Sequence, residues 1–185
     1  MAAGCHAPRA VHTVGHSTRA IETLLDLLSA HSIARVVDVR RWPASRRHPQ
    51  FAREALARSL ASREIEYDWR GDLGGFRKAH PDSPNTGWRE PSFRAYADFM
   101  LTRDFESAIA SVEAAAAAQR IALLCAEAVP WRCHRQLLAD ALTVRNWPVR
   151  HLMDDTCHLH ALTAFARATG VRIVYSVADL FTVEP

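Results

Sequence analysis

The chain has 185 residues, of which 49% are hydrophobic and 23% are charged, and its formal net charge is +3. This composition is typical of a soluble globular protein, and the length is enough to bury a core in one domain without disulfides. The low net charge argues only weakly for a nucleic-acid or membrane partner. Lys78 is the only lysine, so nearly all of the positive charge is arginine, which binds anions through planar, bidentate contacts.

No segment has eighteen uninterrupted apolar residues, and residues 1–17 contain no apolar core of signal-peptide length. The sequence therefore predicts a cytoplasmic protein with no membrane partner, in a compartment where thiols stay reduced. A disulfide between Cys125 and Cys133 is disfavoured in such a compartment. Thiol chemistry at these two residues remains open.

Patterns typical of strands and helices alternate in the first half of the chain. In order, they predict a strand over 10–16, a helix over 17–31, a strand over 34–40, a helix over 49–63 and a strand over 65–69. Residues 70–90 hold four glycines and two prolines and predict a long loop. Loops of this length inside a compact domain are usually functional or mobile.

The alternation continues in the second half of the chain. It predicts helices over 92–101 and 104–119, a strand over 121–125, a helix over 132–146, a strand over 147–153, a helix over 155–169 and a strand over 171–177. Repeated strand–helix units predict a single three-layer α/β domain over residues 1–185, with a mostly parallel sheet. In such sheets ligands bind at the carboxyl ends of the strands, so the turns that follow the strands are the places to seek a site.

The turn Gly15-His16-Ser17 follows the first predicted strand. Ser17 or Thr18 can cap the next helix, and the backbone N–H groups of such a turn can bind an anion. The spacing matches no dinucleotide-binding or P-loop motif, so a plain helix start is the structural alternative.

Four arginines lie in the segment 40–48, which follows the second predicted strand and contains no acidic residue. Arg40, Arg41 and Ser45 are candidates to bind an anion there. A solvated basic loop is the structural alternative. Trp42 and Pro43 interrupt the segment, which favours a fixed conformation with some arginines turned inward.

Cys133 and His134 are predicted in the first turn of the helix over 132–146. The buried stripe of that helix directs His134 toward the sheet. The helix N-terminus, Arg132 and Arg135 all favour the thiolate of Cys133. The structural alternative is a core histidine that donates to a backbone carbonyl.

Cys125 ends a buried strand, and Glu127 is the nearest carboxylate beyond it. Cys125 either packs or opens into a cleft at the strand end. Glu127 is a candidate general acid or base, with an ion pair to an arginine as the alternative. The two cysteines are too far apart for the short Cys-x₂₋₄-Cys spacing of structural zinc sites, so we predict no metal and no cofactor.

Four motifs occur together in one order along the chain. They are TVGHST (13–18), VVDVRRWPASRRHPQF (36–51), LGG (73–75) with Arg77, and CAE (125–127) followed by CHR (133–135). The set resembles the bacterial family called domain of unknown function 488, over about residues 11–151. That resemblance implies an α/β fold and a clustering of these motifs, without an established activity. Residues 152–185 are expected to form a helix–strand extension of this core.

We therefore expect an enzyme that acts on a small anionic, phosphate-bearing substrate. The catalytic candidates are Cys133, His134, Glu127 and Cys125. The candidates for substrate binding are Gly15, His16, Ser17, Arg40, Arg41, Ser45, Gly74, Gly75, Arg77 and Arg135.

We also expect two features of the site's shape. His16, Arg40, Cys125 and His134 should converge on one cleft. The loop over 70–90 should cover that cleft as a lid, with Gly74 and Gly75 giving close approach and Arg77 pointing inward.

Two alternative functions remain at this point. The first is a nucleic-acid-binding or DNA-repair-associated module, in which the arginines contact phosphates and Trp42 or Trp88 stacks on a base. The second is a rigid scaffold for partner proteins. The sequence indicates no particular oligomeric state.

Overall fold

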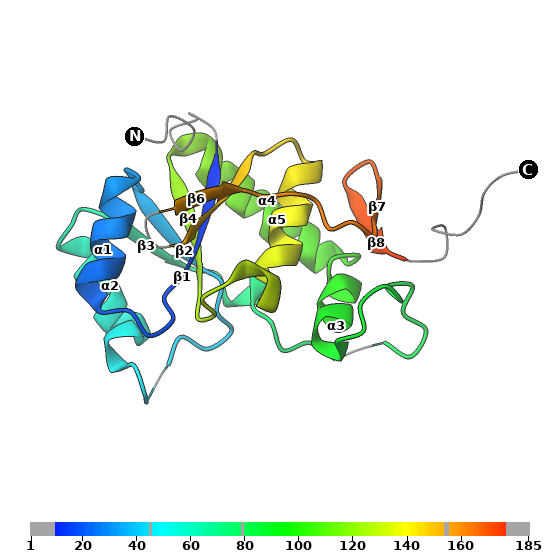
Figure 1. The fold of residues 1–185 in the computed structure, drawn as a ribbon, viewed down its shortest axis with the longest axis horizontal. Helices are drawn as coiled ribbons and strands as arrows, with labels where there is room; N and C mark the ends of the chain where they lie inside the picture. Colours follow the sequence, from blue (N-terminus) through cyan, green and yellow to red (C-terminus); the bar gives the residue numbers. More distant parts are fainter. Residues whose placement is uncertain (1–9, 45, 79, 154–155, 177–185) are drawn as a thin grey trace, which may run out of the picture.

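The computed structural model describes residues 10–44, 46–78, 80–153 and 156–176. Six strands form one sheet in the order β3-β2-β4-β1-β5-β6. Their bounds are β1 Val11–Gly15, β2 Arg35–Asp38, β3 Glu66–Trp69, β4 Ile121–Cys125, β5 Val149–Met153 and β6 Thr156–Leu159. All neighbouring pairs are parallel except β5 and β6. The predicted α/β architecture with a mostly parallel sheet is confirmed (Figure 1).

The described residues form five α-helices, which lie on both sides of this sheet (Figure 1). The helices are α1 Ile21–Ala30, α2 Arg53–Ala61, α3 Pro91–Phe99, α4 Arg103–Ala118 and α5 Arg135–Val144. Because side chains alternate along a strand, Val36 packs with α1 and α2, whereas Val37 packs with α3, α4 and α5. The two apolar cores therefore lie on opposite faces of the sheet. None of the helices in the described ranges is long and apolar enough to cross a membrane.

Helix α1 begins later than the sequence predicted. Its N-cap is Ala20, and no side chain caps it, so the expected capping by Ser17 or Thr18 is wrong. The N–H groups of His16 and Ser17 instead donate to the carbonyls of Cys125 and Ala126. These bonds hold the turn after β1 against the turn after β4, and the chain becomes helical only beyond them.

Helix α5 also begins later than predicted. A short 3₁₀ helix, η3 (Pro130–Arg132), precedes it, and Cys133 lies between the two with extended backbone angles. His134 is the N-cap of α5, so the helix proper starts at Arg135. Cys133 and His134 thus lie just before the first turn rather than inside it. They remain at the positive end of the helix.

The predicted helix over 155–169 is wrong. Residues 156–159 form β6, which pairs antiparallel with β5, and Ala166–Thr169 (β7) pairs with Arg172–Tyr175 (β8). The buried carboxylate of Asp140 on α5 accepts hydrogen bonds from the hydroxyls of Thr163 and Tyr175. These bonds fix the segment in an extended course, which outweighs a weak helical pattern. The strands predicted over 147–153 and 171–177 are confirmed as β5 and β8.

Candidate functional site

A cavity of about 500 Å³ opens at the carboxyl ends of β2 and β4. The end of β4, the loop after β2, the turn after a second short 3₁₀ helix, η2 (Gly71–Leu73), and helix α3 form its walls. Its lining residues are Arg40, Arg41, Trp42, Gly75, Phe76, Arg77, Ser92, Phe93, Tyr96, Cys125, Ala126, Glu127, Arg132, Cys133 and His134. All four predicted catalytic residues therefore border one cavity.

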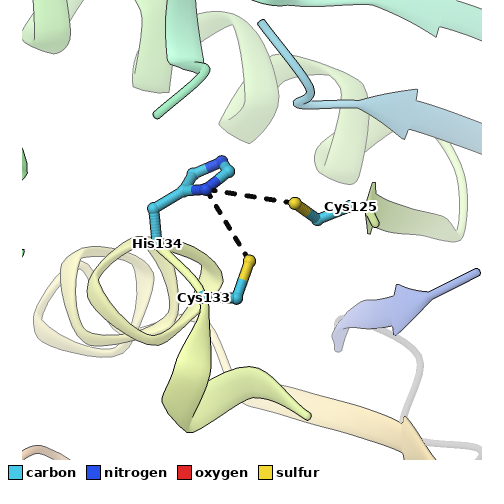
Figure 2. A group of neighbouring side chains, drawn as sticks. All are labelled: Cys125, Cys133 and His134. Atoms are coloured by element: carbon cyan, nitrogen blue, oxygen red, sulfur yellow. Dashed lines mark hydrogen bonds between the residues drawn. The ribbon is translucent and has the colours of Figure 1, made fainter. Parts of the chain in front are cut away.

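Two sulfur atoms and one ring nitrogen form a compact group in the cavity wall, which we call the thiol–imidazole centre (Cys125, Cys133 and His134). The Nδ1 atom of His134 lies 3.7 Å from the sulfur of Cys133 and 4.0 Å from that of Cys125. Figure 2 shows both sulfurs directed at the same nitrogen. Both cysteines are free thiols, so the disfavoured disulfide is indeed absent between them.

The ring of His134 is fixed by contacts on its other side. Its Nε2 lies 3.1 Å from the carbonyl oxygen of Val39 at the end of β2. Because a carbonyl can only accept, Nε2 carries a proton. Nδ1 faces the sulfurs, with a lone pair in the neutral ring and with an N–H in the imidazolium. The ring of Tyr96 packs against it, with centroids 5.1 Å apart. The predicted direction of His134, toward the sheet, is confirmed.

The two thiols have opposite pKa shifts. Burial raises the pKa of Cys133, but hydrogen bonds from Cys125 and His134 and the charges of His134 and Arg135 outweigh it and hold that pKa well below its usual value. The hydrogen bond with Cys133, followed by burial, raises the pKa of Cys125 well above its usual value. The backbone N–H of Arg135 also approaches the Cys133 sulfur at 3.5 Å. These contacts favour the thiolate at Cys133 and the thiol at Cys125.

Arg135 supports the centre from behind. Its buried guanidinium donates to the backbone carbonyl of Glu127 at 2.5 Å and lies 3.4 Å from the hydroxyl of Thr13. A Cβ at Gly15 would lie 1.8 Å from that same carbonyl oxygen, so only glycine fits there. Gly15 and Arg135 thus position the turn that carries Glu127, and neither lines the cavity. The predicted anion cradle at residues 15–17 is not formed, because the N–H groups of His16 and Ser17 are already bonded.

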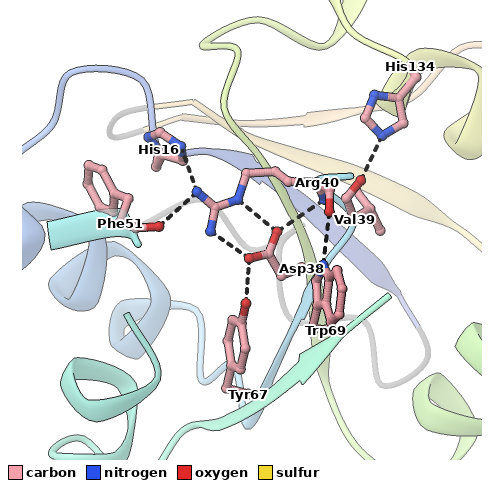
Figure 3. A network of polar contacts seen from close by, with 8 residues as sticks. All are labelled: His16, Asp38, Val39, Arg40, Phe51, Tyr67, Trp69 and His134. Carbon is pink, nitrogen blue, oxygen red and sulfur yellow. Dashed lines mark hydrogen bonds and ion pairs between the residues drawn. The ribbon is translucent and has the colours of Figure 1, made fainter. Parts of the chain in front are cut away.

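A second polar group lies on the opposite face of the sheet, and we call it the buried ion-pair cluster (His16, Asp38, Arg40 and Tyr67). The guanidinium of Arg40 donates to both carboxylate oxygens of Asp38, at 2.8 and 2.5 Å. The hydroxyl of Tyr67 donates to the same carboxylate at 2.7 Å. Figure 3 shows the side chain of Arg40 running away from His134.

His16 belongs to this buried cluster rather than to the cavity. Its ring stacks on Phe51 with centroids 4.2 Å apart, and its Nε2 lies 3.2 Å from the guanidinium of Arg40. The expected convergence on one cleft is therefore wrong for His16, whereas Arg40, Cys125 and His134 all border the cavity. Strand alternation explains the error, because residues on neighbouring strand ends share an edge of the sheet but not always a face.

The loop over 70–90 borders the cavity only with its first part. A Cβ at Gly74 would lie 2.6 Å from the backbone of Arg41, and one at Gly75 would lie 3.4 Å from Nδ1 of His134, so the predicted close approach is confirmed. Arg77 lines the cavity and lies over the ring of Phe99 at 3.6 Å.

The later part of the loop packs elsewhere. Gly87 contacts Phe165, and Trp88 packs among Phe93, Phe165 and Tyr175. Trp88 is thus part of the apolar packing between α3 and β8, and the expectation that it stacks on a base is wrong. Ser45 lies outside the described residues.

Charged side chains at the mouth of the cavity have few partners. Arg41 and Arg132 form no ion pair within the described part of the chain, and the carboxylate of Glu127 forms none there either. The ion pair with an arginine, which was the structural alternative for Glu127, is thus not formed among the described residues. These groups are available to a ligand.

Sequence reasoning missed the aromatic wall of the cavity. Phe93 and Tyr96 come from α3, and the hydroxyl of Tyr96 donates to the carbonyl of Leu73 at 2.7 Å, which holds the glycine turn in place. No sequence motif marked these aromatics, and only the tertiary packing of α3 brings them to the cavity.

The comparisons with known proteins identify a family without an activity. The model of the family described as Domain of unknown function DUF488 matches residues 20–142. No curated protein and no solved structure matches the chain. The matched range contains Arg41, Glu127 and the whole thiol–imidazole centre.

Proposed function

Since the chain belongs to the DUF488 family, whose function is unknown, we propose from the site itself that it is an enzyme acting on a small anionic substrate. The cavity holds the substrate, and the Cys133 thiolate is the reactive group. One observation supports this most: two free thiols, a ring nitrogen and arginines that form no ion pair among the described residues line a single cavity of about 500 Å³. That size suits a small molecule.

Arginine and aromatic side chains at the cavity suggest the class of substrate. Arg41 and Arg132 provide guanidinium groups for a phosphate or carboxylate. Trp42, Phe76 and Phe93 provide apolar surface beside them. A substrate with an anionic group and a planar apolar portion matches both, whereas a bare inorganic anion would use only the arginines.

The thiol–imidazole centre provides the chemistry. Nδ1 of His134 can accept the proton of Cys133, which leaves a thiolate beside an imidazolium. Cys125 keeps its proton and donates a hydrogen bond to that thiolate. Glu127 at the cavity wall is the candidate general acid or base toward the substrate.

Ligand binding tests the substrate class. Phenyl phosphate and inorganic phosphate are titrated into the protein by calorimetry. We expect phenyl phosphate to bind about tenfold more tightly, because contact of its ring with the aromatic wall is worth roughly 1.4 kcal/mol. Arg41→Ala should weaken phenyl phosphate binding about fivefold to tenfold. Absence of binding by either probe, or an unchanged affinity in Arg41→Ala, would contradict the proposal.

Alkylation tests the reactive group. Chelator-treated protein is exposed to iodoacetamide at pH 7, and modified peptides are counted by mass spectrometry over time. We expect Cys133 to react faster than Cys125, and phenyl phosphate to slow that reaction. Cys133→Ser should remove the fast modification and leave the fold intact. If Cys133 reacts only after denaturation, it is a packing residue and the thiolate role is wrong.

An exposed aromatic pair favours the second candidate, a module that binds single-stranded nucleic acid. The side chains of Trp42 and Phe76 are 65% and 83% exposed, with ring centroids 5.4 Å apart beside Arg41. Such rings can stack on bases. Binding of a labelled single-stranded oligonucleotide would then weaken steeply with salt, whereas phenyl phosphate binding changes little. Loss of oligonucleotide binding in Trp42→Ala would support this candidate, and no binding at low salt would exclude it.

A further inference from the structure

The thiol–imidazole centre has the donor set of a metal site. The donor atoms of Cys125, Cys133 and His134 all lie within 4.8 Å of one another. We propose that these three residues bind a Zn²⁺ ion whose fourth coordination position opens into the cavity. This inference rests on the proposed function for the substrate cavity and goes beyond it in the chemistry: with the ion bound, Cys133 is a ligand, and the ion takes the place of the thiolate as the group that meets the substrate. A thiolate can serve as a metal ligand as readily as it can serve as a nucleophile.

The distances within the centre match a tetrahedral ion. With Zn–S bonds of about 2.3 Å and Zn–N bonds of about 2.0–2.1 Å, sulfur and nitrogen ligands lie roughly 3.5 Å apart. The two sulfurs lie 3.7 and 4.0 Å from Nδ1 of His134. Small side-chain movements would therefore close the three atoms around an ion, without a change of backbone.

The ring of His134 is held as a metal ligand needs. A ligating histidine usually donates its second N–H to a carboxylate or a backbone carbonyl, which fixes the tautomer and the ring direction. Nε2 of His134 has this partner in the carbonyl of Val39, at 3.1 Å. The backbone N–H of Arg135 in turn approaches the Cys133 sulfur at 3.5 Å. Both contacts leave lone pairs on Nδ1 of His134 and on the Cys133 sulfur free to point at the proposed ion position between the three donors.

The number of donors indicates an open site. Structural zinc sites have four protein ligands, whereas catalytic sites have three and leave one position to water or substrate. Among the described residues this group contains three donors of the His, Cys, Asp and Glu types. All three line the cavity, so the fourth position faces the space where the substrate is proposed to bind.

The charges around the centre tolerate the ion. Zn²⁺ with two thiolates and a neutral imidazole carries no net charge, so Arg135 and Arg41 are not repelled by it. Cys125 must lose its proton to become a ligand, so binding should release protons and strengthen as the pH rises.

Metal titration tests the site without reference to activity. Chelator-treated protein is titrated with Co²⁺ and then Zn²⁺, with absorption spectroscopy and elemental analysis of the dialysed complex. We expect one equivalent of Co²⁺ with sulfur-to-cobalt charge-transfer absorption, displaced by Zn²⁺. Zn²⁺ should also slow alkylation of Cys133 by iodoacetamide. Absence of the charge-transfer absorption would overturn the inference.

Three variants locate the ion, and one serves as a control. Cys133→Ser, Cys125→Ser and His134→Ala should each weaken binding by at least about tenfold to a hundredfold. His158→Ala, at an exposed histidine on β6, should bind normally. Circular dichroism checks that each variant is folded. If Cys133→Ser does not fold, Cys133→Ala is used in its place. Tight binding retained in Cys133→Ser would place the ion elsewhere and overturn the inference.

The outcomes also separate this inference from the proposed function. One equivalent of metal without phenyl phosphate binding leaves the metal site standing and contradicts the substrate class. Phenyl phosphate binding without metal affinity leaves the proposed function standing with a metal-free thiolate, and overturns the inference.

Discussion

The two polar groups at the carboxyl end of the sheet differ in how their charges are satisfied. In the buried ion-pair cluster, Asp38 and Arg40 form a bidentate pair with side chains 0% and 7% exposed. On the other face, Arg41 lines the cavity and forms no ion pair within the described ranges. A closed, internally paired group stabilises the fold around it, whereas unpaired charges beside a cavity remain available to a ligand. Neighbours in the sequence can therefore have opposite roles.

The largest loss of stability should follow from breaking the buried ion-pair cluster. Arg40→Met leaves the carboxylate of Asp38 buried without its cation, which should cost about 3–5 kcal/mol of unfolding free energy. Urea unfolding measures the loss. The double variant Asp38→Asn, Arg40→Met removes the isolated charge and should recover part of it. A loss below about 1 kcal/mol for Arg40→Met would show that the pair is solvated and that the contrast between the two faces is wrong.

The pH dependence of the unfolding free energy should show that His16 is held neutral in the buried ion-pair cluster. Burial lowers the pKa of His16 to about 4, whereas an unfolded histidine titrates near 6.5. Between these values the unfolded chain binds a proton that the folded chain does not. The contribution of His16 is therefore complete above pH 6.5 and is lost as the pH falls toward 4, up to about 3 kcal/mol.

His16→Gln isolates this contribution. Urea unfolding at pH 7, 5.5 and 4.5 should show a smaller loss of stability in the variant than in the parent protein. Burial also lowers the pKa of His151 on the other face, to about 3, but that residue is unchanged in both proteins. Equal losses in parent and variant would mean that His16 is open to protonation in the folded state.

Gly74 tests how tightly the cavity wall is built. Its backbone angles suit any residue, so the only obstacle to alanine is space. A Cβ there would lie 2.6 Å from the backbone of Arg41, and the two segments would have to separate. Gly74→Ala should cost about 1–3 kcal/mol and also weaken phenyl phosphate binding.

Gly75→Ala is the matched control for that test. Its Cβ would lie 3.4 Å from the ring of His134, a contact that a small movement relieves. We expect a cost below about 1 kcal/mol. Equal losses of unfolding free energy in Gly74→Ala and Gly75→Ala would show that the segments of Gly74 and Arg41 separate easily.

The fold was largely predictable because its signals are local. Apolar runs such as residues 121–125 and the stripe of α5 are set by strand and helix periods, and both are confirmed. The segment after β5 was mispredicted, because its course depends on Asp140, a distant residue that binds Thr163 and Tyr175. Helix α1 starts later than predicted because backbone bonds between two turns replace the expected side-chain cap, and α5 starts later because a 3₁₀ helix precedes it.

The candidate site was predictable only in part, for a similar reason. Cys125, Cys133 and His134 come from one short segment, so their meeting follows from a strand and helix packed together. His16 follows β1 and Arg40 follows β2, the strands on either side of β4. The two side chains nevertheless meet on the other face of the sheet, and no local pattern in the sequence predicts the face that a loop side chain takes. The aromatic wall depends on where α3 packs against α5 and β8, which is set by tertiary packing alone.

The smallest effect on stability should come from Arg41, next to the residue whose loss matters most. The guanidinium of Arg41 lies 6.0 Å from the ring of Trp42, a contact worth about 0.5 kcal/mol at an exposed site. Arg41→Ala should therefore change the unfolding free energy by no more than about 0.5 kcal/mol, measured by urea unfolding beside Arg40→Met. A loss comparable to that of Arg40→Met would mean that Arg41 holds the loop rather than a ligand. If Arg41→Ala is stable but binds phenyl phosphate more weakly, Arg40 stabilises the fold and the adjacent Arg41 binds the ligand.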